Sequence, residues 1–300
     1  MGGYVMYDFK QMYLPYSIEE ALELLEENKG AEIISGGTDV LIKMREGKLE
    51  DATLINIHEI KELKGIHMEE DGTIVIGAGT VFSHITNNEI IQTYIPMLGE
   101  AVDEVGGPQI RNMGTIGGNI CNGVTSADSA SSLFVFNAIM ELRSKRGTRY
   151  VPMDQWYVGA GQTVREQDEL LVSIRIAKKE YEKFYGHYIK YGKRNAMEIA
   201  TLGCAVAVKL SEDKETIEEL RVAFGVAGPT PLRCPNLEEL AAGMGLNERV
   251  VTIIGKGVLA EVNPRSSWRA SKEFRLQLIE EMSKRAFRKA VTLAGGEIHA

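Results

Sequence analysis

The stretch over residues 106–123 constrains this chain more than any other. It holds six glycines in eighteen residues, mixed with small polar side chains and almost no charge. Glycine adds no side chain to a core and loses the most conformational entropy on ordering. Such a segment is suited to bringing the backbone close to a ligand and pointing several N–H groups at it. We therefore predict an anion site here, with the diphosphate of a bound cofactor as the anion.

Apolar residues recur through the same stretch at Ile110, Met113, Ile116 and Ile120. This spacing predicts that the segment packs inward while its amides stay exposed, which is unusual for a mere connection. The alternative is a glycine-rich surface loop without a ligand. We favour the functional interpretation.

A second glycine turn, Gly36-Gly37, follows a predicted short strand over residues 31–35 and precedes a predicted helix over residues 40–46. A strand, a glycine pair and a helix start together aim free amides at an anion. The alternative is a tight turn in which Thr38 or Asp39 caps the helix. One such turn alone would favour that alternative. Two glycine turns free of lysine favour one ligand held from both sides.

Other motifs for nucleotides, metals and nucleophiles are missing from the sequence. No GxGxxG occurs, and Gly77-Ala78-Gly79 lacks the third glycine of a Rossmann fingerprint. There is no Walker-type phosphate loop and no GxSxG nucleophile elbow. The five histidines have no metal-ligand spacing, and Cys121 is better explained as a small filler than as a reactive thiol. We predict no metal site and no catalytic side chain.

Charge and composition exclude several partner classes. The chain of 300 residues has a formal net charge of −8 and no long basic cluster, which argues against nucleic acid and anionic membranes. No apolar run reaches the ~18–20 residues of a membrane span, and residues 1–16 lack the pattern of a signal peptide. Three scattered cysteines form neither a disulfide framework nor a ligand set for zinc or iron–sulfur. We expect a reducing cytoplasm.

The pattern of elements predicts an α+β fold in two domains, with a boundary near residue 178. Ser17 and Glu20 form a capping box that opens a helix with a buried leucine-rich face. Further elements up to residue 176 are strands at 53–57, 73–76, 139–144 and 170–176, and helices at 83–92, 96–105 and 128–138. Beyond a charged linker at 178–183 we expect antiparallel strands at 184–191, 201–210 and 220–226, and helices at 237–242, 248–259 and 271–293.

Two polar residues remain ambiguous from their sequence context. Asp128 is equally well explained as a helix N-cap or as an acceptor for ribose or ribityl hydroxyls beside a diphosphate loop. Lys190 lies in a predicted strand, where a solvated, outward-facing side chain is the simplest interpretation.

The two glycine segments together carry a resemblance. The matching runs are Ile34-Ser35-Gly36-Gly37-Thr38-Asp39 and Gly107-Pro108-Gln109-Ile110-Arg111-Asn112-Met113-Gly114-Thr115-Ile116-Gly117-Gly118-Asn119-Ile120. They resemble the FAD-binding (medium) subunits of the molybdenum hydroxylase family, and most nearly those of bacterial xanthine dehydrogenases. The likeness continues through Cys121-Asn122-Gly123, Thr125-Ser126-Ala127-Asp128-Ser129, Lys190-Tyr191 and Pro264-Arg265-Ser266-Ser267-Trp268-Arg269-Ala270-Ser271-Lys272-Glu273-Phe274-Arg275.

This resemblance implies the fold and the site. Residues 1–177 would form an FAD-binding domain of the vanillyl-alcohol-oxidase (PCMH) type, in two subdomains split near residue 56. Residues 178–300 would form a CO-dehydrogenase-flavoprotein-like C-terminal domain with an antiparallel three-stranded sheet and helices. Asp128 would bind along the sugar or ribityl part of FAD, Leu171 would give a backbone or packing contact, and Lys190 a polar contact. The full set of implied FAD-binding residues is Glu32, Ile33, Ile34, Ser35, Gly36, Gly37, Thr38, Asp39, Gly114, Thr115, Ile116, Gly117, Gly118, Asp128, Leu171 and Lys190.

The same resemblance implies a division of labour between subunits. A large partner would carry the molybdenum cofactor, and a small partner would carry two [2Fe–2S] clusters, in a heterotrimer or its dimer. Electrons would reach FAD from the clusters and leave to NAD+ as hydride, in purine catabolism. The three scattered cysteines give no sign of the extra cluster found in one relative, the FAD subunit of 4-hydroxybenzoyl-CoA reductase. The family-like start is Met6-Tyr7-Asp8-Phe9, so residues 1–5 would be an extension or a cloning remnant.

Three other functions stay open on the sequence. The chain could serve a hydroxylase for nicotinate, carbon monoxide or another aromatic, since substrate chemistry lies on the partner. It could be a free-standing flavin oxidoreductase, which would need a base or a covalent flavin attachment that we do not find. It could also be a nucleotide-binding assembly factor without redox turnover.

Overall fold

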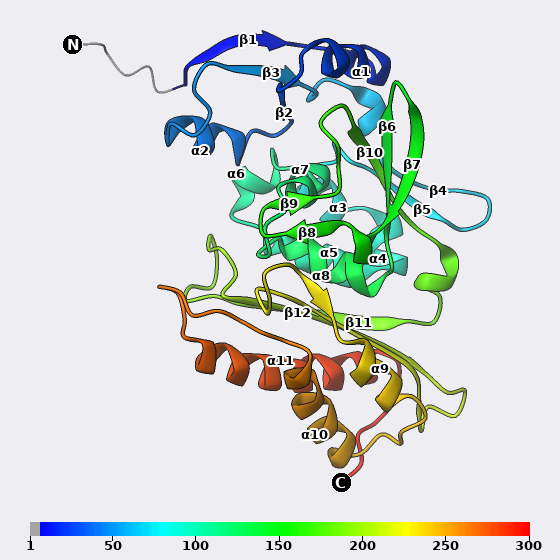
Figure 1. The fold of residues 1–300 in the computed structure, drawn as a ribbon. Coiled ribbons are helices and arrows are strands. Elements are labelled where there is room, and N and C mark those ends of the chain that lie inside the picture. The colour runs from blue at the N-terminus through cyan, green and yellow to red at the C-terminus, as the bar shows by residue number, and fades with distance from the viewer. Residues whose placement is uncertain (1–6) are drawn as a thin grey trace.

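The structure, a computed structural model, describes residues 7–300; the expected extension and Met6 lie outside the described residues. Three groups of elements are stacked one on the next along the molecule (Figure 1). The first and last groups are joined through a middle group that contains most of the short helices.

The first group is a parallel sheet in the order β1-β3-β2, flanked by two helices. Its elements are β1 (Phe9–Tyr13), α1 (Ile18–Glu27), β2 (Glu32–Ile34), α2 (Val40–Arg45) and β3 (Ala52–Asn56). As predicted, the Ser17 side chain caps α1 by accepting from the N–H of Glu20 at 3.2 Å. The glycine turn at residues 36–37 connects β2 to α2.

The middle group is a five-stranded antiparallel sheet packed against small helices. In spatial order its strands are β4 (Ile66–Met68), β5 (Ile74–Gly77), β10 (Leu170–Ile176), β6 (Ile139–Ser144) and β7 (Gly147–Pro152). A small hairpin of β8 (Tyr157–Gly159) and β9 (Gln162–Thr163) lies apart from that sheet. The helices are α3 (Phe82–Thr86), α4 (Glu89–Tyr94), α5 (Pro96–Asp103), α6 (Pro108–Arg111), α7 (Ile116–Cys121) and α8 (Asp128–Val135).

Two predicted helices of this group differ from the structure. The helix predicted over residues 83–92 is divided into α3 and α4, because the Asn88 side chain accepts from the N–H groups of Ile90 and Ile91 and starts a new helix. The helix predicted over residues 128–138 ends at Val135, and Asn137 adopts a left-handed conformation with φ of 43°.

The last group is an antiparallel sheet with helices on one side. It contains four strands rather than the predicted three, since the two-residue strand β14 is too short to show a pattern. The elements are β11 (Tyr185–Tyr191), β12 (Leu202–Leu210), β13 (Ile217–Gly225), β14 (Leu232–Arg233), α9 (Pro235–Ala241), α10 (Glu248–Gly257) and α11 (Lys272–Leu293).

Strand β12 is buried on both faces, and its side chains differ in size between the two. Ala205 and Ala207 belong to the core shared with α5 and α8, whereas Val206 and Val208 belong to the core under α11. Because alternate strand residues face opposite sides, the small alanines let α8 approach the sheet closely. The last sheet is therefore sandwiched between α11 and the helices of the middle group.

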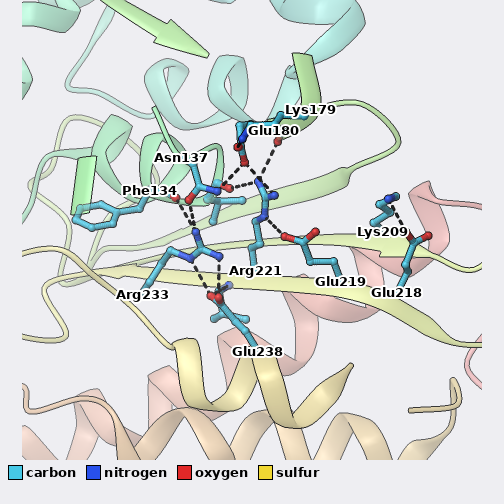
Figure 2. A network of polar contacts seen from close by, with 12 residues as sticks. Phe134, Asn137, Lys179, Glu180, Lys209, Glu218, Glu219, Arg221, Arg233 and Glu238 are labelled. Carbon is cyan, nitrogen blue, oxygen red and sulfur yellow. Dashed lines mark hydrogen bonds and ion pairs between the residues drawn. The ribbon is translucent and has the colours of Figure 1, made fainter. Parts of the chain in front are cut away.

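Helix α8 is fixed at its C-terminal end by two arginines of the last sheet (Figure 2). Arg221 of β13 donates to the carbonyl of Val135 at 3.0 Å and pairs with Glu180 at 3.0 Å. Arg233 of β14 donates to the carbonyl of Phe134 at 3.4 Å. Cations at helix C-termini satisfy free carbonyls and complement the helix dipole, so α8 ties the middle group to the last sheet.

No helix within residues 7–300 has the length and apolar character required to cross a bilayer.

Candidate functional site

The two glycine segments lie directly against each other. A Cβ atom added to Gly36 would be 1.9 Å from the carbonyl oxygen of Met113, so only glycine permits this approach. The Thr115 hydroxyl donates to the Ser35 hydroxyl at 3.4 Å. One site is therefore bordered by both segments, although they are about eighty positions apart in sequence.

The first segment presents unpaired backbone donors. The N–H groups of Gly36, Gly37, Thr38 and Asp39 have no hydrogen-bond acceptor among residues 7–300. Gly37 adopts φ of 72°, which turns the chain between β2 and α2. Asp39 occupies the N-cap position of α2, as in the alternative of a capped turn, but its side chain makes no cap bond. Successive free N–H groups of this kind form a concavity that binds anions.

The second segment is different, because the protein itself uses most of its amides. The N–H of Ile116 donates to the carbonyl of Thr80 at 3.0 Å, and that of Gly117 donates to the carbonyl of Ala78 at 2.8 Å. Gly118 donates to the Thr115 hydroxyl at 3.2 Å, which caps α7. The N–H of Thr115 has no acceptor among residues 7–300. The segment packs inward as expected, but the prediction that its amides stay exposed is wrong for most of it.

The adjacent glycines of this segment have different surroundings. Gly117 is buried, and an added Cβ would lie 2.6 Å from the carbonyl oxygen of Ala78. Gly118 is exposed, and an added Cβ would lie 3.1 Å from the Thr115 hydroxyl. Gly117 therefore permits close packing, whereas Gly118 leaves space at the surface of the site. The small residues at 77–79, excluded as a Rossmann fingerprint, form the support for this loop.

Asp128 and Lys190 are brought together from the middle group and the last sheet. The Asp128 carboxylate accepts from the Tyr188 hydroxyl at 2.8 Å and from the Lys190 ammonium at 2.9 Å. Lys190 also donates to the carbonyl of Glu104 at 2.7 Å. Its side chain is only 7% exposed, so the interpretation of a solvated strand residue is wrong.

The N-cap interpretation of Asp128 is also wrong, because Ala127 occupies the cap position and Asp128 is the first residue of α8. Burial raises the pKa of Asp128 to about 6, against the opposing effects of the Lys190 charge and of hydrogen bonds from Lys190 and Tyr188. The pair is therefore a buried ionic link between the two parts of the molecule, at the start of the helix that follows the second glycine segment.

The apolar residues of the predicted site have side chains in the cores. Leu171 is 3% exposed and Ile116 is fully buried, while Ile34 packs with Met44 and Leu54. Beside Leu171, the strand register shifts, and the Val172 carbonyl accepts from the N–H of Ala78 at 2.9 Å. Only the backbone of these residues is available to a ligand.

Sequence reasoning missed several residues that organise the site. Tyr188 and the Glu104 carbonyl complete the surroundings of Asp128 and Lys190. Ser129 donates to the Asn119 side chain at 2.7 Å and so links α7 to α8. The alternation of β11 could have placed Tyr188 and Lys190 on one face of the strand, since they are two positions apart.

Neither a metal-ligand cluster nor an activated thiol is found among the described side chains of the site. Within residues 7–300, no cluster of three or more metal-ligating side chains is found. Burial raises the pKa of the Cys121 thiol to about 11, which keeps it protonated, and all three cysteines are free. The site offers backbone donors and a buried carboxylate, a donor set that fits the diphosphate and hydroxyl groups of FAD.

Family models match both parts of the chain. Residues 7–178 match the FAD binding domain in molybdopterin dehydrogenase, and residues 187–290 match the CO dehydrogenase flavoprotein C-terminal domain. The xanthine dehydrogenase FAD-binding subunit of Escherichia coli O157:H7 is 42% identical over 98% of this chain and 100% of its own length. The nicotinate dehydrogenase FAD-subunit of Eubacterium barkeri is 33% identical over 80% of this chain and 82% of its own.

A solved structure has the same fold. It is the carbon monoxide dehydrogenase from Hydrogenophaga pseudoflava that lacks the Mo-pyranopterin moiety of its molybdenum cofactor. The TM-score is 0.89 at 30% sequence identity, over 95% of this chain and 98% of that one. With an FAD-binding domain followed by the flavoprotein C-terminal domain, this chain belongs to the FAD-binding subunits of the molybdenum hydroxylase family.

Proposed function

We propose that this chain is the electron-transfer FAD subunit of a xanthine dehydrogenase-like complex. The observation that carries the proposal is the turn at residues 36–39, whose four free N–H groups lie beside the second glycine segment. The turn needs no lysine to bind an anion, because backbone donors supply the hydrogen bonds. The similarity to the xanthine dehydrogenase subunit of Escherichia coli supports the choice of complex.

We assign the cofactor contacts to backbone groups at Glu32, Ile33, Ile34, Ser35, Gly36, Gly37, Thr38, Asp39, Gly114, Thr115, Ile116, Gly117, Gly118 and Leu171, and to the side chains of Asp128 and Lys190. Gly36 and Gly118 would allow the diphosphate to approach the backbone. Asp128 already accepts two hydrogen bonds and keeps lone pairs for a ligand hydroxyl. When bound, FAD would supply the redox chemistry, which needs no acid–base side chain from this chain.

We place the domain boundary at residues 177/178, with two subdomains split near residue 56. The support is that β3 ends the parallel sheet at Asn56, and that β11 opens the last sheet at Tyr185. The ionic link between Asp128 and Lys190 crosses this boundary and would hold the C-terminal domain beside the cofactor.

The partners in this proposal are a large subunit with the molybdenum cofactor and a small subunit with two [2Fe–2S] clusters, in a heterotrimer or its dimer. Electrons would pass from the clusters through this subunit to NAD+. A reducing cytoplasm, in which the three free cysteines would persist, and a role in purine catabolism are part of the same proposal.

A second candidate is the same role in a different hydroxylase. It is favoured by the similarity to the nicotinate dehydrogenase FAD-subunit and to the carbon monoxide dehydrogenase structure. Purification of the native complex, followed by turnover assays with xanthine, nicotinate and carbon monoxide, separates the two candidates. Oxidation of xanthine by the complex is the expected result.

The direct test is to mix NADH with the FAD-loaded chain without oxygen. Bleaching of the flavin absorbance is expected, because hydride exchange with NAD+ is reversible in principle. Gly118→Val protein, reconstituted in the same way, should contain little FAD. The control variant Gly245→Ala should retain FAD, because an added Cβ there meets only ordinary contacts at 3.7 Å or more. A chain that takes up no FAD on reconstitution contradicts the proposal. A loaded chain that NADH does not bleach contradicts the choice of acceptor.

A further inference from the structure

An exposed tryptophan lies at the end of the last sheet where β11 finishes. Trp268, in the loop before α11, is 76% exposed, more than any other large hydrophobic side chain that is described within residues 7–300. Nearby in the connection between β11 and β12, Met197 and Ile199 are 63% and 53% exposed. A tryptophan left in water is unusual in a monomer and is typical of a buried anchor in an interface.

Cations surround this tryptophan. The Lys193 ammonium lies 5.4 Å from the ring centroid of Trp268, and the Arg269 guanidinium lies 4.2 Å from it. The Nε of Arg269 is shielded from water yet has no hydrogen-bond partner among residues 7–300. We call residues 193–199 and 264–273 the cationic patch; their charged side chains are Lys193, Arg194, Glu198, Arg265, Arg269, Lys272 and Glu273. Cations thus dominate the patch, although the chain as a whole carries a net charge of −8.

The loop that carries Trp268 is ordered by a buried arginine. Arg275 is 2% exposed, and it donates to the Ser267 hydroxyl at 2.9 Å and to the Thr201 carbonyl at 3.3 Å. It also donates to the Arg265 carbonyl. The tryptophan is therefore presented by a preformed loop, which lowers the entropic cost of binding a partner.

The cationic patch is continuous with the cofactor site. The N–H of Met197 donates to the carbonyl of Gly106 at 3.2 Å, and Gly107 packs so closely that an added Cβ would lie 3.1 Å from the Met197 side chain. Lys190, three residues before Lys193, lies near the end of β11. A protein seated on the patch would therefore lie next to the second glycine segment.

We propose that the cationic patch docks an acidic face of the partner subunit that delivers electrons to the flavin. This identity of the partner rests on the proposed function. Trp, Arg and Met are the side chains that dominate interface cores, and complementary charge raises association rates and fixes orientation. The Arg269 guanidinium lies against the exposed Trp268 ring, so a partner that covers the tryptophan would also meet this charge.

The test uses the full chain and its partner subunits, with Trp268→Ala and Arg269→Glu as variants. We expect each variant to weaken association by about 10- to 100-fold, in the range of interface hot spots. Wild-type association should weaken as salt is raised, and that dependence should be smaller in Arg269→Glu. The matched control is Lys179→Glu, which reverses an exposed charge at the other end of β11.

The outcomes separate this inference from the proposed function. The isolated variants should bind FAD and unfold like the wild type, because Trp268 lies outside both glycine segments. Failure of the wild-type chain to bind FAD would remove the proposed function and the partner's identity with it. If the wild type binds FAD and both variants associate as the wild type does, the docking inference is overturned. Tight binding of DNA or anionic vesicles by the patch, with no effect on subunit association, overturns it as well.

Discussion

The two glycine segments look alike in sequence and do different things in the structure. The turn at residues 36–39 leaves four N–H groups without a protein acceptor. In the segment at residues 114–118, the N–H groups of Gly114, Ile116, Gly117 and Gly118 all have acceptors in the chain. The first segment therefore keeps its donors free, whereas the second uses most of its donors in packing against the rest of the protein.

The difference shows that glycine is required for two separate physical reasons. At Gly37 it permits a left-handed turn that exposes amides, whereas at Gly117 it lets one backbone pack on another. Gly36 has a free N–H and also contacts the second segment at Met113. Composition alone cannot separate these uses, but substitutions can.

The largest loss of stability is expected for Gly36→Ala, which disrupts the contact between the two glycine segments. The added Cβ would meet a backbone oxygen at 1.9 Å, so the loops must separate. Overpacking against backbone should cost about 3 kcal/mol of unfolding free energy, and FAD binding should be lost. Denaturant unfolding and FAD content measure both. Wild-type stability and FAD content in this variant would show that the segments do not depend on this contact.

A smaller effect is expected at Gly117, with the neighbouring Gly118 as its matched partner. Gly117→Ala should lower stability by about 2 kcal/mol, because its Cβ would press on the Ala78 carbonyl. Gly118→Ala should change the free energy of unfolding by less than about 0.5 kcal/mol, as exposed substitutions do. Relative to this small loss of stability, its loss of FAD affinity should be greater than that of Gly117→Ala. Thermal unfolding and FAD titration of both variants test this. Equal stability losses at the two positions would contradict the division into packing and approach.

Per pH unit, a smaller effect than at Gly36 or Gly117 is expected from the ionic link that follows the second segment. The pKa of Asp128 is about 6 in the folded protein, above its ordinary value of 3.8, so between pH 4 and 6 the folded state holds more protons than the unfolded state. Its contribution to stability is therefore present below pH 4 and is lost as the pH rises through 6, by up to about 1 kcal/mol per pH unit.

Asp128→Asn cannot titrate, so the stability difference between wild type and variant should fall over this pH range. Urea unfolding at several pH values gives that difference, and other carboxylates cancel because both proteins carry them. A difference that stays constant from pH 4 to 6 would show that Asp128 titrates in the folded state as it does in the unfolded state.

Local signals in the sequence predicted much of the fold, and tertiary contacts decided the rest. Ser17 and the apolar face behind it identified α1, because capping and periodicity act within one helix. The division at Asn88 was missed, since an asparagine inside an apolar pattern does not show that it caps a helix. Strand β1 was missed because its residues are exposed on both faces and show no alternation.

The candidate site divides in the same way. Both glycine segments could be found from composition and from the strand–glycine–helix order. Which amides stay free could not, because that depends on the carbonyls of Ala78 and Thr80, more than thirty residues away in the chain. Likewise Asp128 and Lys190 each had a plausible local role, and only the docking of the last sheet makes them a pair.

With the cofactor bound at Asp128 as proposed, helix α8 would make cofactor loading and domain attachment reciprocal. Its first residue, Asp128, is bonded to β11, and its last carbonyls are bonded to Arg221 and Arg233. By thermodynamic linkage, a ligand that orders the start of α8 would strengthen the attachment of the C-terminal domain. That attachment would strengthen binding of the ligand by the same free energy. Amide hydrogens in β12, which α8 covers, should then exchange more slowly once the cofactor is bound.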